Sequence, residues 1–146
     1  MDWSFEEKSA WGSLLAVVIS SWLFFPVALT HLAAGGELRE LAGRAILVVF
    51  VIVVVEIVYH SIFAIASRNT GSDERDVLIS MKADKWSGYV LAFGVCWIIG
   101  LIVVRDVLPG SPPPSSVLIA IYLLLALTVS EASKILLQIW YYRTGI

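Results

Sequence analysis

Four long runs of apolar residues dominate the pattern of hydrophobic and polar positions along this chain. They cover residues 11–32, 44–66, 86–108 and 116–140. A helix needs about 20 apolar residues to cross about 30 Å of hydrocarbon, because each residue adds about 1.5 Å. The alternating ten-residue segments of a membrane β-barrel are absent from the sequence. The pattern therefore predicts an all-α integral membrane protein in which residues 1–146 form a single domain with four transmembrane helices.

Composition agrees with this prediction. Hydrophobic residues make up 59% of the chain and charged residues 15%, whereas soluble domains average about 45–50% apolar and about 25% charged residues. The Lys and Arg residues are scattered, so we expect no nucleic-acid partner. The start, MDWSFEEKSA, lacks the basic n-region of a signal peptide, and we expect the first span to be retained as an anchor.

The basic residues between the spans predict the orientation. With four spans, both termini and the loop 67–85 share one side of the membrane. That side carries six basic residues and the other side three, with Lys134 left aside as intramembrane: Lys8, Arg68, Arg75, Lys82, Lys85 and Arg143 against Arg39, Arg44 and Arg105. Positive residues concentrate on the cytoplasmic side. We therefore expect a protein of the bacterial inner or plasma membrane, with both termini and the loop 67–85 in the cytoplasm.

The two halves of the chain resemble each other in their rarer residues. A shift of 75 positions pairs Trp11 with Trp86, Trp22 with Trp97, Gly35 with Gly110, Glu56 with Glu131 and Arg68 with Arg143. The sequence thus predicts two helical hairpins related as a parallel repeat. A shift of 74 instead pairs His60 with Lys134, so the register of the repeat stays open.

Four ionisable residues interrupt the apolar runs of the second and fourth spans. They form two short-range pairs, Glu56 with His60 and Glu131 with Lys134. Residues three or four apart share a helix face, and charge within a membrane is costly unless it is paired or faces the bundle interior. One hypothesis is a site that handles protons or cations, since a buried carboxylate and a histidine both titrate in a useful range. The other is a structural polar network that holds the helices together.

The sequence offers little for other chemistry. No second intramembrane histidine supports a metal or haem site, so no metal and no cofactor is predicted. Recognisable nucleophile, phosphate-loop and intramembrane protease motifs are missing, and no catalytic residue is assigned. These observations favour a protein that is not an enzyme without deciding the question.

The third span carries small residues at every fourth position: Gly88, Ala92, Cys96 and Gly100. Such a stripe lets two helices approach closely. The contact is expected either within the bundle or between protomers, and we expect a homo-oligomer, with a dimer as the simplest form.

The segment before the third span combines charge with an apolar face. Ser72 can cap a helix whose first turn holds acidic residues, and apolar residues follow from Val77. One interpretation is a solvated helix start. The other is a docking site for a protein partner on the cytoplasmic loop within 73–86, centred on Asp73, Glu74, Arg75 and Asp76.

This segment also resembles a family of small uncharacterised bacterial and archaeal membrane proteins. The shared pattern is Asp73-Glu74-Arg75-Asp76, then Ile79 and Lys82-Ala83, between two hydrophobic hairpins. The resemblance covers residues 68–105 and, beyond them, only the layout of the chain. It implies a four-span membrane protein and no particular activity.

Three functional hypotheses follow. The first is a proton- or cation-linked transporter, channel or transport-accessory subunit centred on Glu56, His60, Glu131 and Lys134. The second is a scaffold or sensor that binds a partner through residues 73–86. The third is a lipophilic-ligand binder or membrane enzyme.

Overall fold

The chain forms four helices in a computed structural model that describes residues 5–67, 74–108, 110 and 112–145. The helices are α1 (Phe5–Ala33), α2 (Leu38–Ser67), α3 (Glu74–Val107) and α4 (Ser116–Thr144). No strand occurs within these ranges. The predicted all-α fold class is confirmed for this part of the chain.

Within the residues that the structure describes, three helices are long and apolar enough to cross a membrane. They are Ser9–Ala33 within α1, all of α3, and all of α4. These helices include the predicted spans 11–32 and 116–140 and nearly all of 86–108. The predicted span 44–66 lies within α2, whose side chains are described only in part, and it stays a prediction.

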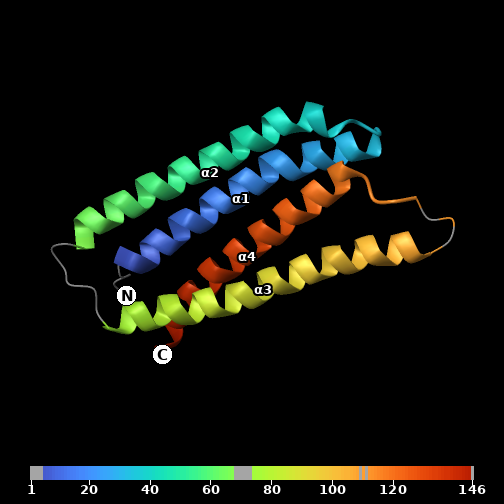
Figure 1. The fold of residues 1–146 in the computed structure, drawn as a ribbon. Helices are drawn as coiled ribbons and strands as arrows, with labels where there is room; N and C mark the ends of the chain where they lie inside the picture. The colour runs from blue at the N-terminus through green and yellow to red at the C-terminus, as the bar shows by residue number, and fades with distance from the viewer. Residues whose placement is uncertain (1–4, 68–73, 109, 111, 146) are drawn as a thin grey trace.

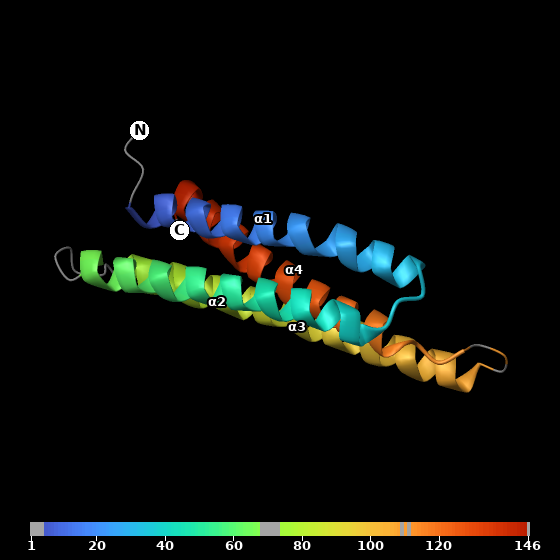
Figure 2. The same ribbon diagram turned by 90° about the horizontal axis from the view of Figure 1, so that it is seen from above.

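The helices lie side by side and alternate in direction (Figures 1 and 2). Their principal contacts join α2 to α1, α1 to α4, and α4 to α3, so α1 and α4 occupy the middle. The first described turn of α1 and the last of α4 lie at the same end of the molecule, where α2 ends and α3 begins (Figure 1). The chain thus reverses its direction from each helix to the next.

Small residues bring α3 and α4 into the most extensive helix contact of the fold. In the first half of α3, Ile79, Ala83 and Ser87 are buried. A Cβ atom on Gly94 would lie 2.8 Å from the Cβ of Ala126, so α4 passes directly over this glycine. The buried Ser130 hydroxyl donates to the Ser87 carbonyl oxygen at 2.9 Å and ties the two backbones together.

Two apolar clusters hold α1 against α4 at different heights. The cluster near the termini contains Ala10 and Val17 of α1 with Ile135 and Ile139 of α4. The cluster near the hairpin connections joins α1, α2 and α4 through Phe24, Ala28, Leu41, Val117 and Ile121. Between these two heights the helices enclose the pocket described below.

Helix α3 begins at Glu74 and runs without interruption to Val107, so residues 74–85 form one helix with the predicted span. The sequence analysis likewise places a helix start with an acidic first turn in this segment. Acidic Glu74 and Asp76 lie in the first turn, where the helix dipole favours negative charge. Ile79 and Ala83 are buried, at 1% and 0% exposed, which extends the packed face toward this end of the helix.

The small-residue stripe on α3 is exposed. Gly88, Ala92, Cys96 and Gly100 all face outward, and a Cβ atom on Gly88 or Gly100 would meet no atom within 4 Å. The α3–α4 contact uses the face of Gly94 instead. Packing of the stripe between protomers therefore stays a prediction.

Replacing Gly94 tests how tightly α3 and α4 pack. Gly94→Val should lower the stability of the fold by about 1–3 kcal/mol, because its side chain overlaps Ala126. Gly100→Val is the matched control, since it changes helix propensity equally in open space. Unfolding by sodium dodecyl sulfate, followed by circular dichroism, measures both. Equal stability of the two variants would contradict the close approach.

Candidate functional site

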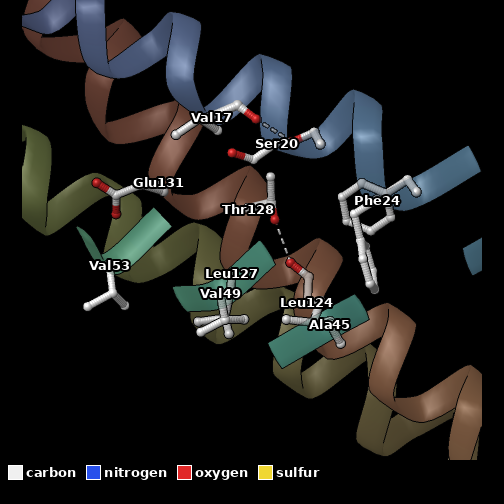
Figure 3. A pocket seen from close by; sticks show the side chains of 12 residues that line it. Val17, Ser20, Phe24, Ala45, Val49, Val53, Leu124, Leu127, Thr128 and Glu131 are labelled. Atoms are coloured by element: carbon white, nitrogen blue, oxygen red, sulfur yellow. Dashed lines mark hydrogen bonds between the residues drawn. The ribbon is translucent and has the colours of Figure 1, made fainter. Parts of the chain in front are cut away.

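A pocket of about 280 Å³ lies between α1, α2 and α4 (Figure 3). Most of its lining is apolar, and it falls between the two apolar clusters that join α1 to α4. The lining residues are Val17, Ser20, Ser21, Phe24 and Phe25 of α1, Ala45, Val49 and Val53 of α2, and Leu124, Leu127, Thr128 and Glu131 of α4. Ligand pockets in proteins usually measure about 300–1,000 Å³, and this one is slightly smaller than that range.

Helical periodicity explains the composition of the walls. Ala45, Val49 and Val53 are four residues apart and form one stripe of α2 that faces the pocket (Figure 3). Phe24 and Phe25 of α1 make an edge-to-face contact with ring centroids 5.4 Å apart. Together these side chains make an apolar wall beside a few polar groups.

Three hydroxyl groups line the pocket, and each donates its proton within its own helix. Ser20 Oγ donates to Ala16 O at 2.7 Å, and Ser21 Oγ donates to Val17 O at 2.6 Å. Thr128 Oγ1 donates to Leu124 O at 2.7 Å. A hydroxyl group that donates one hydrogen bond still has two lone pairs that can accept hydrogen bonds. These groups therefore present hydrogen-bond acceptors to the pocket.

Among the lining residues whose side chains the structure describes, Glu131 is the only ionisable one. It lies near the middle of the 29-residue α4 and is half-buried. Figure 3 shows it at one end of the pocket, with Phe24 at the other end. The structure thus places one of the four predicted cluster residues in a cavity close to the centre of a helix long enough to cross a membrane.

Lys134 makes a contact that the sequence analysis missed. Its Nζ lies 2.9 Å from Oδ1 of Asp84, which joins α4 to α3. Asp84 also accepts a long 3.5 Å hydrogen bond from the Ser80 hydroxyl. Asp84 fell within the predicted loop and was not singled out, although an intramembrane lysine requires an acidic partner. Lys134 is not among the residues that line the pocket.

The structure describes only some of the other predicted site residues. The side chains of Glu56 and His60 lie outside the described residues, as does Asp73. Glu74 and Arg75 are exposed at the start of α3, and Asp76 is half-buried. Among the described residues, no three His, Cys, Asp or Glu side chains come together in an arrangement that could hold a metal ion.

Further polar contacts lie at the end of the molecule that carries the termini. Arg143 Nε pairs with Glu7 Oε1 at 2.9 Å, and its guanidinium lies 5.7 Å from the centroid of the Trp11 ring. Lys82 Nζ lies 5.9 Å from the centroid of the Tyr141 ring. These contacts join the last turns of α4 to α1 and to α3. They position the helices that form the pocket without entering it.

Comparison with known proteins adds no functional assignment. The chain matches no family model, no curated protein and no solved structure.

The Asp84–Lys134 pair can be tested with a double-mutant cycle. Asp84→Asn, Lys134→Met and the double variant should show a coupling energy of roughly 0.2–1 kcal/mol, because both side chains are partly exposed. Unfolding in detergent provides the free energies. Strictly additive effects of the two substitutions would contradict a stabilising ion pair.

Proposed function

We propose that this chain is a small integral membrane protein of the transport class, and that Glu131 binds a proton or a cation in the pocket between α1, α2 and α4. The observation that carries the proposal is a carboxylate at one end of an apolar cavity, near the middle of a membrane-length helix. In this proposal Glu56, His60 and Lys134 complete the predicted polar cluster.

The physical argument is the cost of charge in a medium of low dielectric constant. A carboxylate in the middle of a membrane costs several kcal/mol unless a proton or an opposite charge accompanies it. An acidic residue in such a position is therefore expected to be protonated or to have a cation beside it. The apolar walls limit access of water, which strengthens the interaction with whichever cation is present.

The proposed membrane arrangement follows the sequence prediction. It has four spans arranged as two parallel-repeat hairpins, with both termini in the cytoplasm. One observation supports the repeat: Gly35 and Gly110, which the shift of 75 pairs, both adopt left-handed backbone conformations, with φ of 70° and 88°. The proposed homodimer uses the exposed stripe on α3 that contains Gly88 and Gly100.

Flux in liposomes tests the role of Glu131. Protein reconstituted into vesicles should carry protons or monovalent cations down an imposed gradient, and Glu131→Gln should reduce this flux at least tenfold while leaving the helices folded. Glu40→Gln is the matched control, since Glu40 lies outside the pocket with its carboxylate 71% exposed. Absence of flux under every proton and monovalent-cation gradient would rule out the proposal.

A second candidate function is partner binding by the first turns of α3. Large apolar side chains are exposed there beside the charged residues: Val77, Leu78 and Met81 are 50%, 58% and 63% exposed. The neighbouring Glu74 and Arg75 are exposed as well. This combination suits a protein partner, in the manner of a scaffold or sensor.

Affinity purification tests this second candidate. Arg75→Ala should release a co-purifying protein while circular dichroism shows an intact helical fold, because Arg75 is exposed and no packing depends on it. Lys85→Ala is a control for loss of one exposed positive charge on the same helix. An unchanged set of co-purifying proteins would count against partner binding here.

A further inference from the structure

We infer that the outer face of α3 binds an anionic phospholipid at the end of the molecule that carries the termini. The headgroup lies at Lys82 and Lys85, and an acyl chain runs along the aromatic residues that follow them on α3. This inference goes beyond the proposed function, because it requires a bilayer around the helices and no transport by the pocket.

Two lysines and four aromatic residues form one exposed stripe along α3. Each lies three or four residues from another member, which places them all on one side of the helix. The stripe consists of Lys82, Lys85, Trp86, Tyr89, Phe93 and Trp97. Both lysines are exposed, and the four aromatic residues are between 54% and 71% exposed. The stripe therefore presents positive charge near the start of α3 and aromatic rings from there to the middle of the helix.

Two aromatic residues of α4 extend the stripe at its charged end. Lys82 Nζ lies 5.9 Å from the centroid of the Tyr141 ring, which stacks on Trp140 with ring centroids 6.0 Å apart. On α3, Trp86 and Tyr89 make an edge-to-face contact at 5.8 Å. Tryptophan and tyrosine concentrate where lipid meets water, because their rings are apolar and their N–H and O–H groups are polar. This cluster therefore indicates the level of the lipid headgroups.

The charge at this level favours an anionic headgroup. Lys82 and Lys85 take no part in the salt bridges found among the described residues. Asp84, which lies between them in the sequence, pairs with Lys134 Nζ of α4 at 2.9 Å. The acidic residues of the first turn of α3 lie at least six residues before Lys82. Each lysine ammonium has three N–H donors and no acceptor, which complements the oxygens of a phosphate group.

The apolar part of the stripe favours a lipid over free phosphate. Phe93 and Trp97 continue from the lysines toward the middle of α3 and are 71% and 64% exposed, so an acyl chain can lie against their rings. The predicted orientation places the lysines on the cytoplasmic side, whose leaflet carries the anionic lipids. A lysine near such a surface strengthens binding about fivefold, so the two together distinguish anionic from zwitterionic lipid clearly.

Lipid titration followed by native mass spectrometry tests this inference on the full chain, purified in detergent and freed of lipid. Dioleoyl phosphatidylglycerol should bind about tenfold more tightly than dioleoyl phosphatidylcholine, because the chains are identical and only the first headgroup carries a net negative charge. Glycerol phosphate, which has the charge without the acyl chains, should not displace the bound phosphatidylglycerol.

Variants assign the binding to the stripe. Lys82→Gln combined with Lys85→Gln should weaken binding of phosphatidylglycerol about tenfold and leave binding of phosphatidylcholine unchanged. Arg39→Gln combined with Arg44→Gln is the matched control, since it removes two exposed positive charges from the first turns of α2, at the other end of the molecule (Figure 1). Phe93→Ala should weaken binding of both lipids by the same factor, about twofold to threefold, because it shortens the apolar path. Circular dichroism establishes that each variant is folded.

The possible results separate this inference from its alternatives. Equal affinity for the two lipids would overturn it, as would a lysine variant that binds phosphatidylglycerol as tightly as the native protein or an arginine control that loses as much affinity. Displacement by glycerol phosphate would assign the lysines to free phosphate and overturn the lipid as ligand. Loss of a dimer with unchanged lipid binding in the lysine variant would assign this face to a second copy of the chain. Phosphatidylglycerol binding without any ion flux would support this inference and contradict only transport.

Discussion

Helix α4 packs against α3 along a face of small side chains and against α1 through two apolar clusters, and the candidate site depends on both contacts. The approach at Gly94 and the Ser130–Ser87 hydrogen bond fix α4 on α3. Lipid provides little hydrophobic driving force between helices, so close van der Waals packing and interhelical hydrogen bonds have to hold them together. With α4 fixed in this way, Glu131 is held at the edge of the space that α1 and α2 enclose.

The pocket exists because the α1–α4 contact is interrupted. The two clusters bring α1 and α4 into contact near the termini and near the loops that join the helices of each pair. Between them stand two serines and a threonine, whose side chains are short and bond back to their own helices. Such residues fill little of the space between helices, and α2 covers the gap with the stripe formed by Ala45, Val49 and Val53. The same residues thus create the cavity and supply its hydrogen-bond acceptors.

Much of the fold follows from the sequence, because helix formation in an apolar chain is governed by local periodicity and by run length. The apolar runs predicted the helices and their alternating order, and each helix is longer than the predicted span within it. The charged residues Asp84 and Lys85 lie outside the predicted span 86–108, and in the structure they belong to the same helix, which begins at Glu74. Which faces meet could not be predicted: Gly94 and the exposed Gly100 are both small residues of one helix, and only tertiary contacts distinguish them.

The candidate site was predictable in part for the same reason. Glu131 stood out because a carboxylate within an apolar run is costly. Its hydroxyl neighbours Ser20 and Thr128 did not stand out, since serine and threonine are ordinary in membrane helices and the two residues are distant in sequence. The Asp84–Lys134 pair was missed because Asp84 lies outside the predicted span. Long-range pairing of this kind depends on how α3 and α4 are aligned, which hydropathy does not encode.

The proposed role of Glu131 in binding a proton or a cation can be tested by infrared difference spectroscopy of the protein in bilayers. This method observes side-chain carboxyl groups directly, before and after the pH or the cation concentration is changed. A carboxyl band should respond to the change in the native protein and be absent from Glu131→Gln. A responding band of equal size in both proteins would show that the cation binds elsewhere and that Glu131 does not have this role.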